Sequence, residues 1–323
     1  MLHDALVITA GIAAILILSD AVVRMSDRLM GHYGLSGGFV GLTVLAIGTS
    51  LLEIATHVVG SVKILGAPET YRSMSALLIG SNIGSDIVQQ NLLLPAVALV
   101  AAVTLTPRRV VQGVGGLVAA SALLWVLCLD DRLTRGEGAI LVLLYAAYLL
   151  WLARAENRLG VSFKRRRLDG PRLVLLNAAI AVAFALIALL AGPVLDAATR
   201  LVAVLPVSGS FFGVTVLGIA AAVPELSTAV AALRRGEKEM AAGILIGSNV
   251  TNPMLAAGLG AMISTYHVPP VVTLFDLPMK IATGAVIFLG FWSKSRLSRP
   301  WAGALIVTYF AYLYARLAWF PVD

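Results

Sequence analysis

Ten apolar runs of membrane-spanning length constrain this chain more than any other feature of its sequence. A helix needs about 20 mostly apolar residues to cross the hydrocarbon core of a bilayer. The runs lie at residues 5–23, 35–60, 74–103, 110–129, 137–153, 173–192, 203–233, 239–263, 270–291 and 300–319. Only 13% of the 323 residues are charged, whereas a soluble domain has about 25%. We therefore expect an all-α, polytopic membrane protein with ten transmembrane helices.

The same composition argues against several functional classes. The net charge of +7 does not indicate nucleic-acid binding, because the basic residues lie in short clusters between the apolar runs. The single cysteine, Cys128, allows neither a disulfide framework nor a cysteine metal site. The chain also lacks a glycine-rich phosphate loop. We expect neither an enzyme nor a cofactor; the expected partners are inorganic cations and the lipid bilayer, with no obligate protein partner.

Lysine and arginine are distributed unevenly between the two sides of the expected spans. Seventeen of the 24 fall in the loops after the first, third, fifth, seventh and ninth runs, seven of them within residues 154–172. The other seven are Lys63, Arg72, Arg132, Arg135, Arg200, Lys280 and Arg316. Because cytoplasmic loops carry the excess of basic residues, we expect both termini to be extracytoplasmic. The expected location is the cell (inner) membrane of a prokaryote, as a multi-pass protein.

The sequence contains an internal repeat. Residues 39–60 read FVGLTVLAIGTSLLEIATHVVG and residues 211–232 read FFGVTVLGIAAAVPELSTAVAA, and nine of the 22 positions are identical without a gap. The pentapeptide LIGSN also occurs twice, at 78–82 and 245–249. Repeats at this distance indicate that the chain consists of two related halves.

The two halves are expected to have opposite orientations in the membrane. The first five-helix repeat covers 1–155, a basic cytoplasmic linker covers 156–171, and the second five-helix repeat covers 172–323. Because each half holds an odd number of spans, Glu53 lies on a helix that starts inside and Glu225 on one that starts outside. Inverted repeats of this kind are an architecture of secondary transporters, whose binding site lies at the midplane between the repeats.

Glu53 and Glu225 are the strongest candidates for a functional site. A carboxylate at that depth costs roughly 3 kcal/mol on insertion scales, so intramembrane acids are usually functional. A protonated glutamate that only packs is the alternative, but the recurrence of the pair argues against it. A Gly-Thr-Ser segment at 48–50 precedes Glu53, and Pro224 precedes Glu225; both sequences disfavour a regular helix. Carbonyls released at such breaks, together with hydroxyls and carboxylates, suit a hard cation.

The second motif adds further polar residues. They are Ser81, Asn82, Ser85 and Asp86 in the first half, and Ser248, Asn249, Thr251 and Asn252 in the second. We include Asp86 among the candidate metal ligands, because an aspartate at membrane depth is costly. For Gln89 and Gln90, helix–helix hydrogen bonding is an equally good interpretation. His57 follows Glu53 by one turn, and either carries a proton or only packs.

The segments GLTVLAIGTSLLE and GVTVLGIAAAVPE, each followed by LIGSN, resemble the two alpha-repeats of the cation/calcium antiporter superfamily, which includes the sodium/calcium exchangers. The resemblance covers both halves and the ten-span layout. It implies that Glu53 and Glu225 are central ligands of Ca2+ and Na+ at the midplane. The further ligands that it implies are Thr49, Ser50, the carbonyls near Ala46 and Gly218, Ser81, Ser248, Ser85 and Asn252.

The resemblance also implies a function. We expect a secondary antiporter that exchanges Ca2+, or another divalent cation, for Na+ by alternating access, with spans 1 and 6 sliding past the core. Two uncompensated carboxylates are too costly to carry across a low-dielectric barrier. Only the ion-loaded site should therefore cross the membrane, which makes the protein an exchanger. A passive cation channel is the alternative from another class.

Departures from the family pattern keep a proton-coupled exchanger of the same fold as a second hypothesis. Leu52 replaces the usual proline, and alanines at 220–222 remove the hydroxyls from the second repeat. Three acids around a site that needs two charges for one Ca2+ leave one in excess. We expect Asp86 to keep a proton, with His57 as a second candidate, because Pro253 occupies the equivalent place in the other half.

Overall fold

The computed structural model describes residues 2–33, 36–101, 103–157, 168–204 and 207–320. Most of the expected basic linker, at residues 158–167, lies outside the described residues. The helical elements of the first half are α1 (Leu2–Tyr33), α2 (Gly37–Val40), η1 (Gly41–Leu45), α3 (Ala46–Thr49), α4 (Leu51–Gly66), η2 (Pro68–Thr70), α5 (Tyr71–Val88), η3 (Gln89–Leu93), α6 (Leu94–Ala101), α7 (Pro107–Arg109), η4 (Val110–Gly115), α8 (Gly116–Leu127) and α9 (Arg135–Asn157). Those of the second half are α10 (Gly170–Val204), α11 (Gly209–Phe212), η5 (Gly213–Leu217), α12 (Gly218–Ala221), α13 (Val223–Arg234), α14 (Lys238–Thr251), η6 (Asn252–Ala256), α15 (Ala257–Ile263), η7 (Val272–Asp276), α16 (Leu277–Lys294) and α17 (Arg299–Trp319).

The protein is helical and polytopic, as expected, but the number of spans is only partly supported. Six helices of the described residues are long and apolar enough to cross a membrane, and the bent pair Gly37–Thr49 and Leu51–Gly66 makes a seventh. The count of ten spans therefore stays a prediction. The fold also contains one short antiparallel pair of strands, β1 (Arg132–Leu133) and β2 (Tyr266–His267), which a purely all-α description omits.

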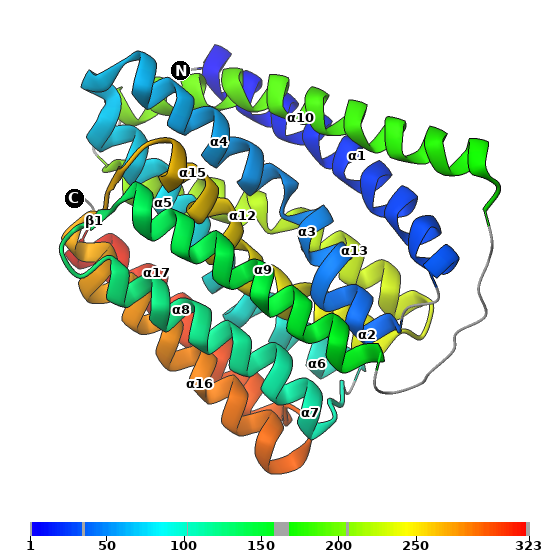
Figure 1. The fold of residues 1–323 in the computed structure, drawn as a ribbon. Helices are drawn as coiled ribbons and strands as arrows, with labels where there is room; N and C mark the ends of the chain where they lie inside the picture. The colour runs from blue at the N-terminus through cyan, green and yellow to red at the C-terminus, as the bar shows by residue number, and fades with distance from the viewer. Residues whose placement is uncertain (1, 34–35, 102, 158–167, 205–206, 321–323) are drawn as a thin grey trace.

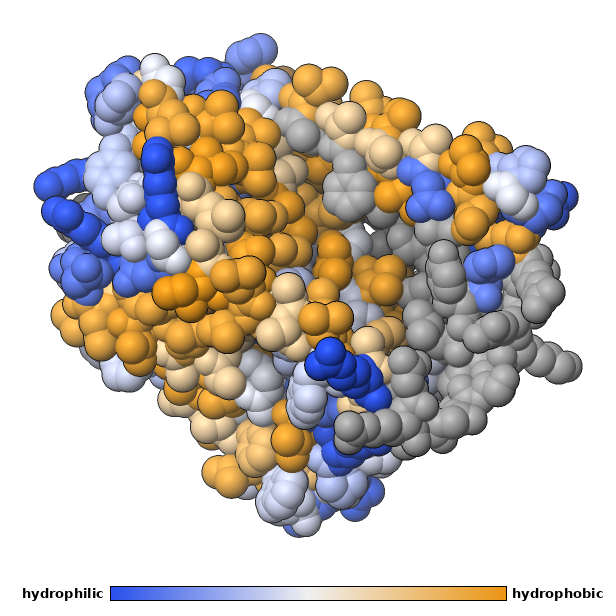
Figure 2. Space-filling view, viewed as in Figure 1, coloured by the Kyte–Doolittle hydropathy of each residue, from blue (hydrophilic) through white to orange (hydrophobic). Residues whose placement is uncertain are grey.

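Two long helices form an outer layer of the molecule. α1 and α10 run side by side along one edge, apart from the group that contains α8, α16 and α17 (Figure 1). Large apolar side chains such as Leu175 and Leu189 of α10 are about 70% exposed. Figure 2 shows apolar residues across the middle of one face and hydrophilic residues toward its edges. This distribution fits a surface in contact with lipid tails.

Each half of the chain packs its first broken helix against the second-motif helix of the other half. α5 contacts α11, η5 and α12, while α14 contacts α2, η1 and α3. A Cβ atom at Gly80 would lie 2.9 Å from the Cα of Ser210, and one at Gly247 would lie 2.7 Å from the carbonyl oxygen of Leu42. Glycine lets the backbones approach this closely, as in other membrane helix pairs. The two glycines are equivalent under the internal repeat, and each contacts the broken helix of the other half, so the halves interlock reciprocally.

Matching caps start the two broken helices. The hydroxyl of Ser36 accepts a hydrogen bond from the N–H of Phe39 at 3.2 Å, and that of Ser208 accepts one from Phe211 at 3.1 Å. Each cap satisfies an N–H group that the first helical turn leaves unpaired. A π-helical turn follows in both halves, η1 in the first and η5 in the second. The local structure therefore repeats along with the sequence.

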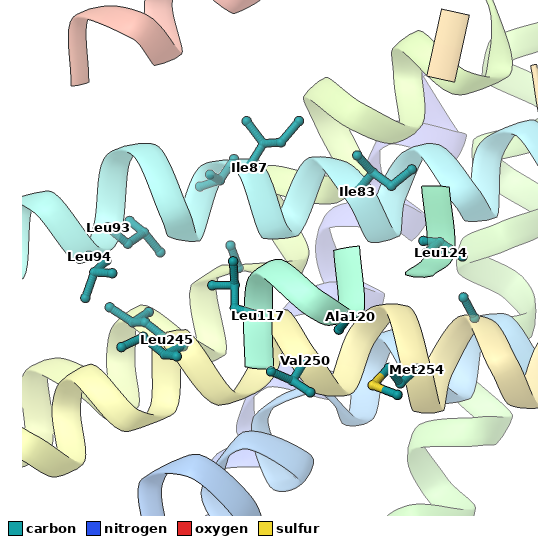
Figure 3. Packing of buried hydrophobic residues seen from close by; sticks show 14 of the residues in the cluster. Ile83, Ile87, Leu93, Leu94, Leu117, Ala120, Leu124, Leu245, Val250 and Met254 are labelled. Atoms are coloured by element: carbon teal, nitrogen blue, oxygen red, sulfur yellow. The ribbon is translucent and has the colours of Figure 1, made fainter. Parts of the chain in front are cut away.

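The apolar core lies between the motif helices and their neighbours. Figure 3 shows buried side chains from several helices gathered in one region, among them Ile83 of α5, Leu117 of α8 and Leu245 of α14. All three are at most 1% exposed. This packing holds the motif helices in a fixed relation to one another.

Two basic residues assigned to loops from the sequence are buried in the bundle. Lys280 and Arg316 are both fully buried. Arg316 is paired with Asp276 at 3.1 Å, and the hydroxyl of Tyr312 donates to the same carboxylate at 2.8 Å. Their assignment to loops was wrong, because both residues lie within helices, α16 and α17, and their side chains point into the bundle. The charge bias between the two sides becomes larger when they are left out.

Candidate functional site

Interruptions in two helices position the paired glutamates. The helix of the first half breaks at Ser50, which separates α3 from α4, and that of the second half breaks at Ala222, between α12 and α13. These are equivalent positions, and they fall in the segments where the sequence predicts breaks. Glu53 and Glu225 are each the third residue of the helix that follows. The N-terminal end of a helix favours a negative charge there.

Glu53 is buried and partly hydrogen-bonded. Its Oε1 accepts hydrogen bonds from the hydroxyl of Ser85 at 2.9 Å and from the amide of Asn252 at 3.4 Å. Its Oε2 is also buried and has no hydrogen-bond partner among the described residues. Ser85 lies on α5 of the same half, whereas Asn252 begins η6 of the other half. The carboxylate therefore lies where the two halves meet.

Glu225 is fully buried, and neither of its carboxylate oxygens has a hydrogen-bond partner within the described part of the chain. The hydroxyl of Thr49 lies near this carboxylate but donates to the carbonyl of Ala46 at 3.3 Å. The negative charges of Glu53 and Asp86 act on Glu225. The structure thus brings the two expected glutamates, from different halves, into one electrostatic environment.

Asp86 is joined to Glu53 through a shared amide. The side-chain amide of Asn252 donates to Oδ1 of Asp86 at 2.8 Å as well as to Glu53. The other carboxylate oxygen of Asp86 forms an ion pair with the ammonium of Lys280, and both side chains are fully buried. Lys280 was not a candidate from the sequence. An opposite charge within another apolar run, with the expectation that intramembrane charges pair, is the signal that could have identified it.

The two expected serines of the LIGSN motifs occupy different surroundings. Ser248 is buried and donates to the side-chain carbonyl of Gln89 and to the backbone carbonyl of Ile244. Ser81 is half-buried and lines a cavity of about 20 Å³, together with Ala221 of α12 and Val194 of α10. The cavity lies between the motif helices and the outer layer, and most of its lining side chains are apolar.

The remaining expected ligands lie at the helix breaks. The Ser50 hydroxyl is buried and has no hydrogen-bond partner among the described residues. The carbonyl of Ala46 accepts from the N–H of Ser50 at 3.0 Å, and that of Gly218 accepts from Ala222 at 3.1 Å. Both carbonyls therefore remain engaged within their own helices, and the Ser50 hydroxyl is the better available oxygen.

His57 belongs to a separate buried cluster. Its Nδ1 lies 3.0 Å from the hydroxyl of Tyr266, which is also 2.6 Å from the hydroxyl of Ser61. Its Nε2 is buried without a hydrogen-bond partner among the described residues. Tyr266 comes from β2, a segment in which no site residue was expected. The cluster packs on α4 one turn beyond Glu53, and no hydrogen bond between His57 and either glutamate is found in the described structure.

The donor set is suited to a hard cation. Three of the four carboxylate oxygens of Glu53 and Glu225 are buried acceptors without donors in the described structure. Buried polar atoms are nearly always hydrogen-bonded, so each exception needs an explanation. No group of three or more His, Cys, Asp or Glu side chains among the described residues is arranged to hold a metal ion. A cation here would therefore take neutral oxygens as well as the two carboxylates.

The chain is similar to known membrane proteins in both sequence and fold. A family model described as "Sodium/calcium exchanger protein" matches residues 3–154 and 176–318. Inner membrane protein YrbG of Escherichia coli (strain K12) is 28% identical over 99% of this chain and 98% of that protein. Sodium/calcium exchanger MaX1 of Methanosarcina acetivorans is 24% identical over 94% of this chain and 95% of that protein. Among solved structures, the fold is similar to sodium-calcium exchanger NCX_Mj, with a TM-score of 0.68 and 22% identity over 98% of both chains.

Proposed function

The chain belongs to the sodium/calcium exchanger family and is a membrane cation antiporter, and from that premise we propose that it exchanges Ca2+, or another divalent cation, for Na+ by alternating access. Glu53 and Glu225 are the central ligands in this proposal. Ser50, Ser85 and Asn252 supply neutral oxygens. The transported ions are substrates, so the protein needs no resident cofactor for this activity.

One observation carries the proposal. The paired glutamates come from equivalent breaks in the two halves, and three of their four oxygens are buried acceptors without donors among the described residues. A bare pair of carboxylates in a low-dielectric environment repels and is poorly solvated. A divalent cation relieves both costs, and two monovalent cations do the same. Movement of the site across the membrane is then favourable only with its cations bound, which is the condition for exchange.

Coupling to protons in place of Na+ is the second candidate. Ala221 and Ala222 stand at the break of the second half and are buried, so this half offers no side-chain oxygen equivalent to Thr49 or Ser50. Fewer neutral oxygens weaken a sodium site. The missing oxygens in the second half are therefore a specific observation in favour of proton coupling. The paired glutamates are compatible with both mechanisms.

The experiment compares the two driving forces directly. Purified protein in proteoliposomes is given 45Ca2+ under an imposed Na+ gradient with pH clamped, and then under a pH gradient without Na+. Uptake driven by the Na+ gradient supports the first proposal, and uptake driven only by the pH gradient supports the second. Saturable counterflow separates a carrier from a channel.

Matched variants assign the site. Glu53→Gln and Glu225→Gln keep the shape of each side chain and remove its charge, so each should abolish Ca2+ uptake. Glu69→Gln makes the same change at an exposed position outside the site and should leave uptake unchanged. Normal exchange in either site variant would remove that glutamate from the proposal.

We also propose that the halves 1–155 and 172–323 are inverted repeats with both termini outside the cytoplasm. The reciprocal packing of α5 and α14 on the opposite broken helices supports the repeat. The burial of Lys280 and Arg316 strengthens the charge bias that sets the orientation. A reporter enzyme that is active only outside the cytoplasm, fused to the C-terminus, should be active; an inactive but expressed fusion would reverse the assignment.

A further inference from the structure

The ion pair between Asp86 and Lys280 has no place in the function proposed so far. Asp86 lies on α5 and Lys280 in the first turn of α16. Both side chains are fully buried, and the ammonium nitrogen contacts Oδ2 of the carboxylate. Removing an ammonium group from water is costly unless a counter-ion and hydrogen bonds replace the solvent. A lysine retained at such a place should therefore have a function.

The pair is electrically part of the glutamate site. The amide of Asn252 donates to Asp86 at 2.8 Å and to Glu53 at 3.4 Å, so a single side chain separates the two carboxylates. The charge of Asp86 acts on both glutamates. Because the surroundings are apolar protein rather than water, these charges interact more strongly than they would at a surface.

The lysine is held in place by its own helix and by η3. The side-chain amide of Gln90 donates to the carbonyl oxygen of Lys280 at 2.6 Å and to the hydroxyl of Thr283 at 2.6 Å. The amide of Asn91 also donates to Thr283, at 3.1 Å. These bonds fix the first turn of α16 against the helix that carries Asp86. The ammonium is therefore a fixed charge of the protein, unlike the cations that the site transports.

The net charge of the transport site is the sum over three acidic side chains and one lysine. Glu53, Glu225 and Asp86 together carry three negative charges when ionised, and Lys280 returns one positive charge. We propose that Lys280 is a permanent internal cation that sets the net charge of the transport site to two negative charges, so that one divalent ion exchanges for two monovalent ions without net movement of charge. The inference rests on the proposed function and adds its stoichiometry.

A site that lacked the charge of Lys280 would exchange its ions in a different ratio. Three negative charges are balanced by three monovalent ions, and their exchange for one divalent ion moves a charge across the membrane. With Lys280 present, a third monovalent ion would leave the loaded site with an uncompensated positive charge at membrane depth, which is costly. The single lysine therefore determines whether membrane potential can drive transport.

The test measures the equilibrium accumulation of Ca2+ in proteoliposomes at a fixed Na+ gradient, with the potential clamped by K+ and valinomycin. If Na+ is not the coupling ion, the same measurement is made with a fixed pH gradient. In the wild type, changing the potential by 100 mV should leave the accumulation ratio unchanged. In Lys280→Met, each 100 mV should change it roughly 50-fold, because one elementary charge moves with each cycle. Equilibrium ratios do not depend on turnover, so a slow variant still reports its stoichiometry.

Two further variants complete the design. Lys280→Met with Asp86→Asn removes both charges of the pair, so its accumulation ratio should again be independent of potential. This double variant also avoids leaving Asp86 buried and unpaired if the single variant folds poorly. Lys63→Met removes a lysine from an ion pair with Asp196 at the protein surface and should behave as the wild type.

Each outcome decides a specific point. A wild-type accumulation ratio that changes roughly 50-fold per 100 mV overturns this inference and leaves the exchange function intact. A Lys280→Met ratio that is independent of potential also overturns it, since the lysine would then not set the charge. An absence of Ca2+ uptake under either ion gradient overturns the proposed function and this inference together.

Discussion

Glu225→Gln should separate cation binding from folding. Both oxygens of this carboxylate are buried without donors in the described structure, and two other carboxylates act on its charge. An unsatisfied buried polar group costs about 1–3 kcal/mol, and a charged group costs more than a neutral one. The amide removes the charge while keeping the shape, so the variant without calcium should unfold at a higher temperature than the wild type.

Calcium should stabilise the wild type and have almost no effect on Glu225→Gln. A ligand present at 100 times its dissociation constant stabilises the state that binds it by about 2.7 kcal/mol. The wild type should gain stability of this order when Ca2+ is added, whereas Glu225→Gln should gain almost none, because one of its two charged ligands is missing. The variant should therefore be the more stable protein without calcium, and the wild type the more stable one when calcium saturates the site.

The assay is thermal unfolding of the detergent-solubilised protein, followed by intrinsic fluorescence over a series of Ca2+ concentrations. Glu69→Gln, at an exposed position, is the matched control and should show the wild-type calcium shift. A calcium shift of wild-type size in Glu225→Gln would refute the reasoning, since the orphaned oxygens would then not be ligands. Lower calcium-free stability in the variant would also refute it, since the carboxylate would then stabilise the calcium-free protein.

Three further predictions concern other parts of the structure. Ala221→Thr combined with Ala222→Ser restores hydroxyls at the break of the second half, and should steepen the dependence of Ca2+ uptake on the Na+ gradient; an unchanged dependence would exclude these positions as sodium ligands. Gly84→Ala places a Cβ within 2.5 Å of the backbone of η5 and should lower thermal stability by about 1–3 kcal/mol, whereas Gly136→Ala meets nothing within 4 Å and should be nearly neutral in the same measurement. Tyr266→Phe removes a hydroxyl shared by two buried side chains and should cost about 1–3 kcal/mol of stability while leaving the coupling ion unchanged; a switch of coupling ion would place this cluster in the transport pathway.

The internal repeat made the central part of the site predictable from sequence. Glu53 and Glu225 could be paired because their local sequences match, and a symmetric fold brings matching residues together. The breaks at Ser50 and Ala222 were also predictable, since residues with poor helix propensity precede one glutamate and a proline precedes the other. Local chemistry determines both features, so a reading of local sequence was sufficient.

Lys280 shows where that reasoning failed. Its partner Asp86 lies 194 positions earlier in the chain, and neither residue has an equivalent in the other half. A single lysine within an apolar run resembles one whose long side chain reaches toward the membrane surface. Only the packing of α16 against α5 and η3 places it beside the site. The expectation that Asp86 keeps a proton was formed without this cation, and it stays a prediction.

The wide turns η1 and η5 set the direction in which the glutamates point. Each is a five-residue π-helical segment that precedes the break in its half, and a π turn holds one residue more than an α-helical turn. Every residue of an α-helix advances the side chains by about 100° around the axis. If η1 and η5 kept all their residues but relaxed into regular α-helical turns, the extra residue of each would rotate the carboxylate that follows by more than a quarter of a revolution. The meeting of the two acids is therefore also a matter of helical phase, counted in residues from Gly41 and Gly213.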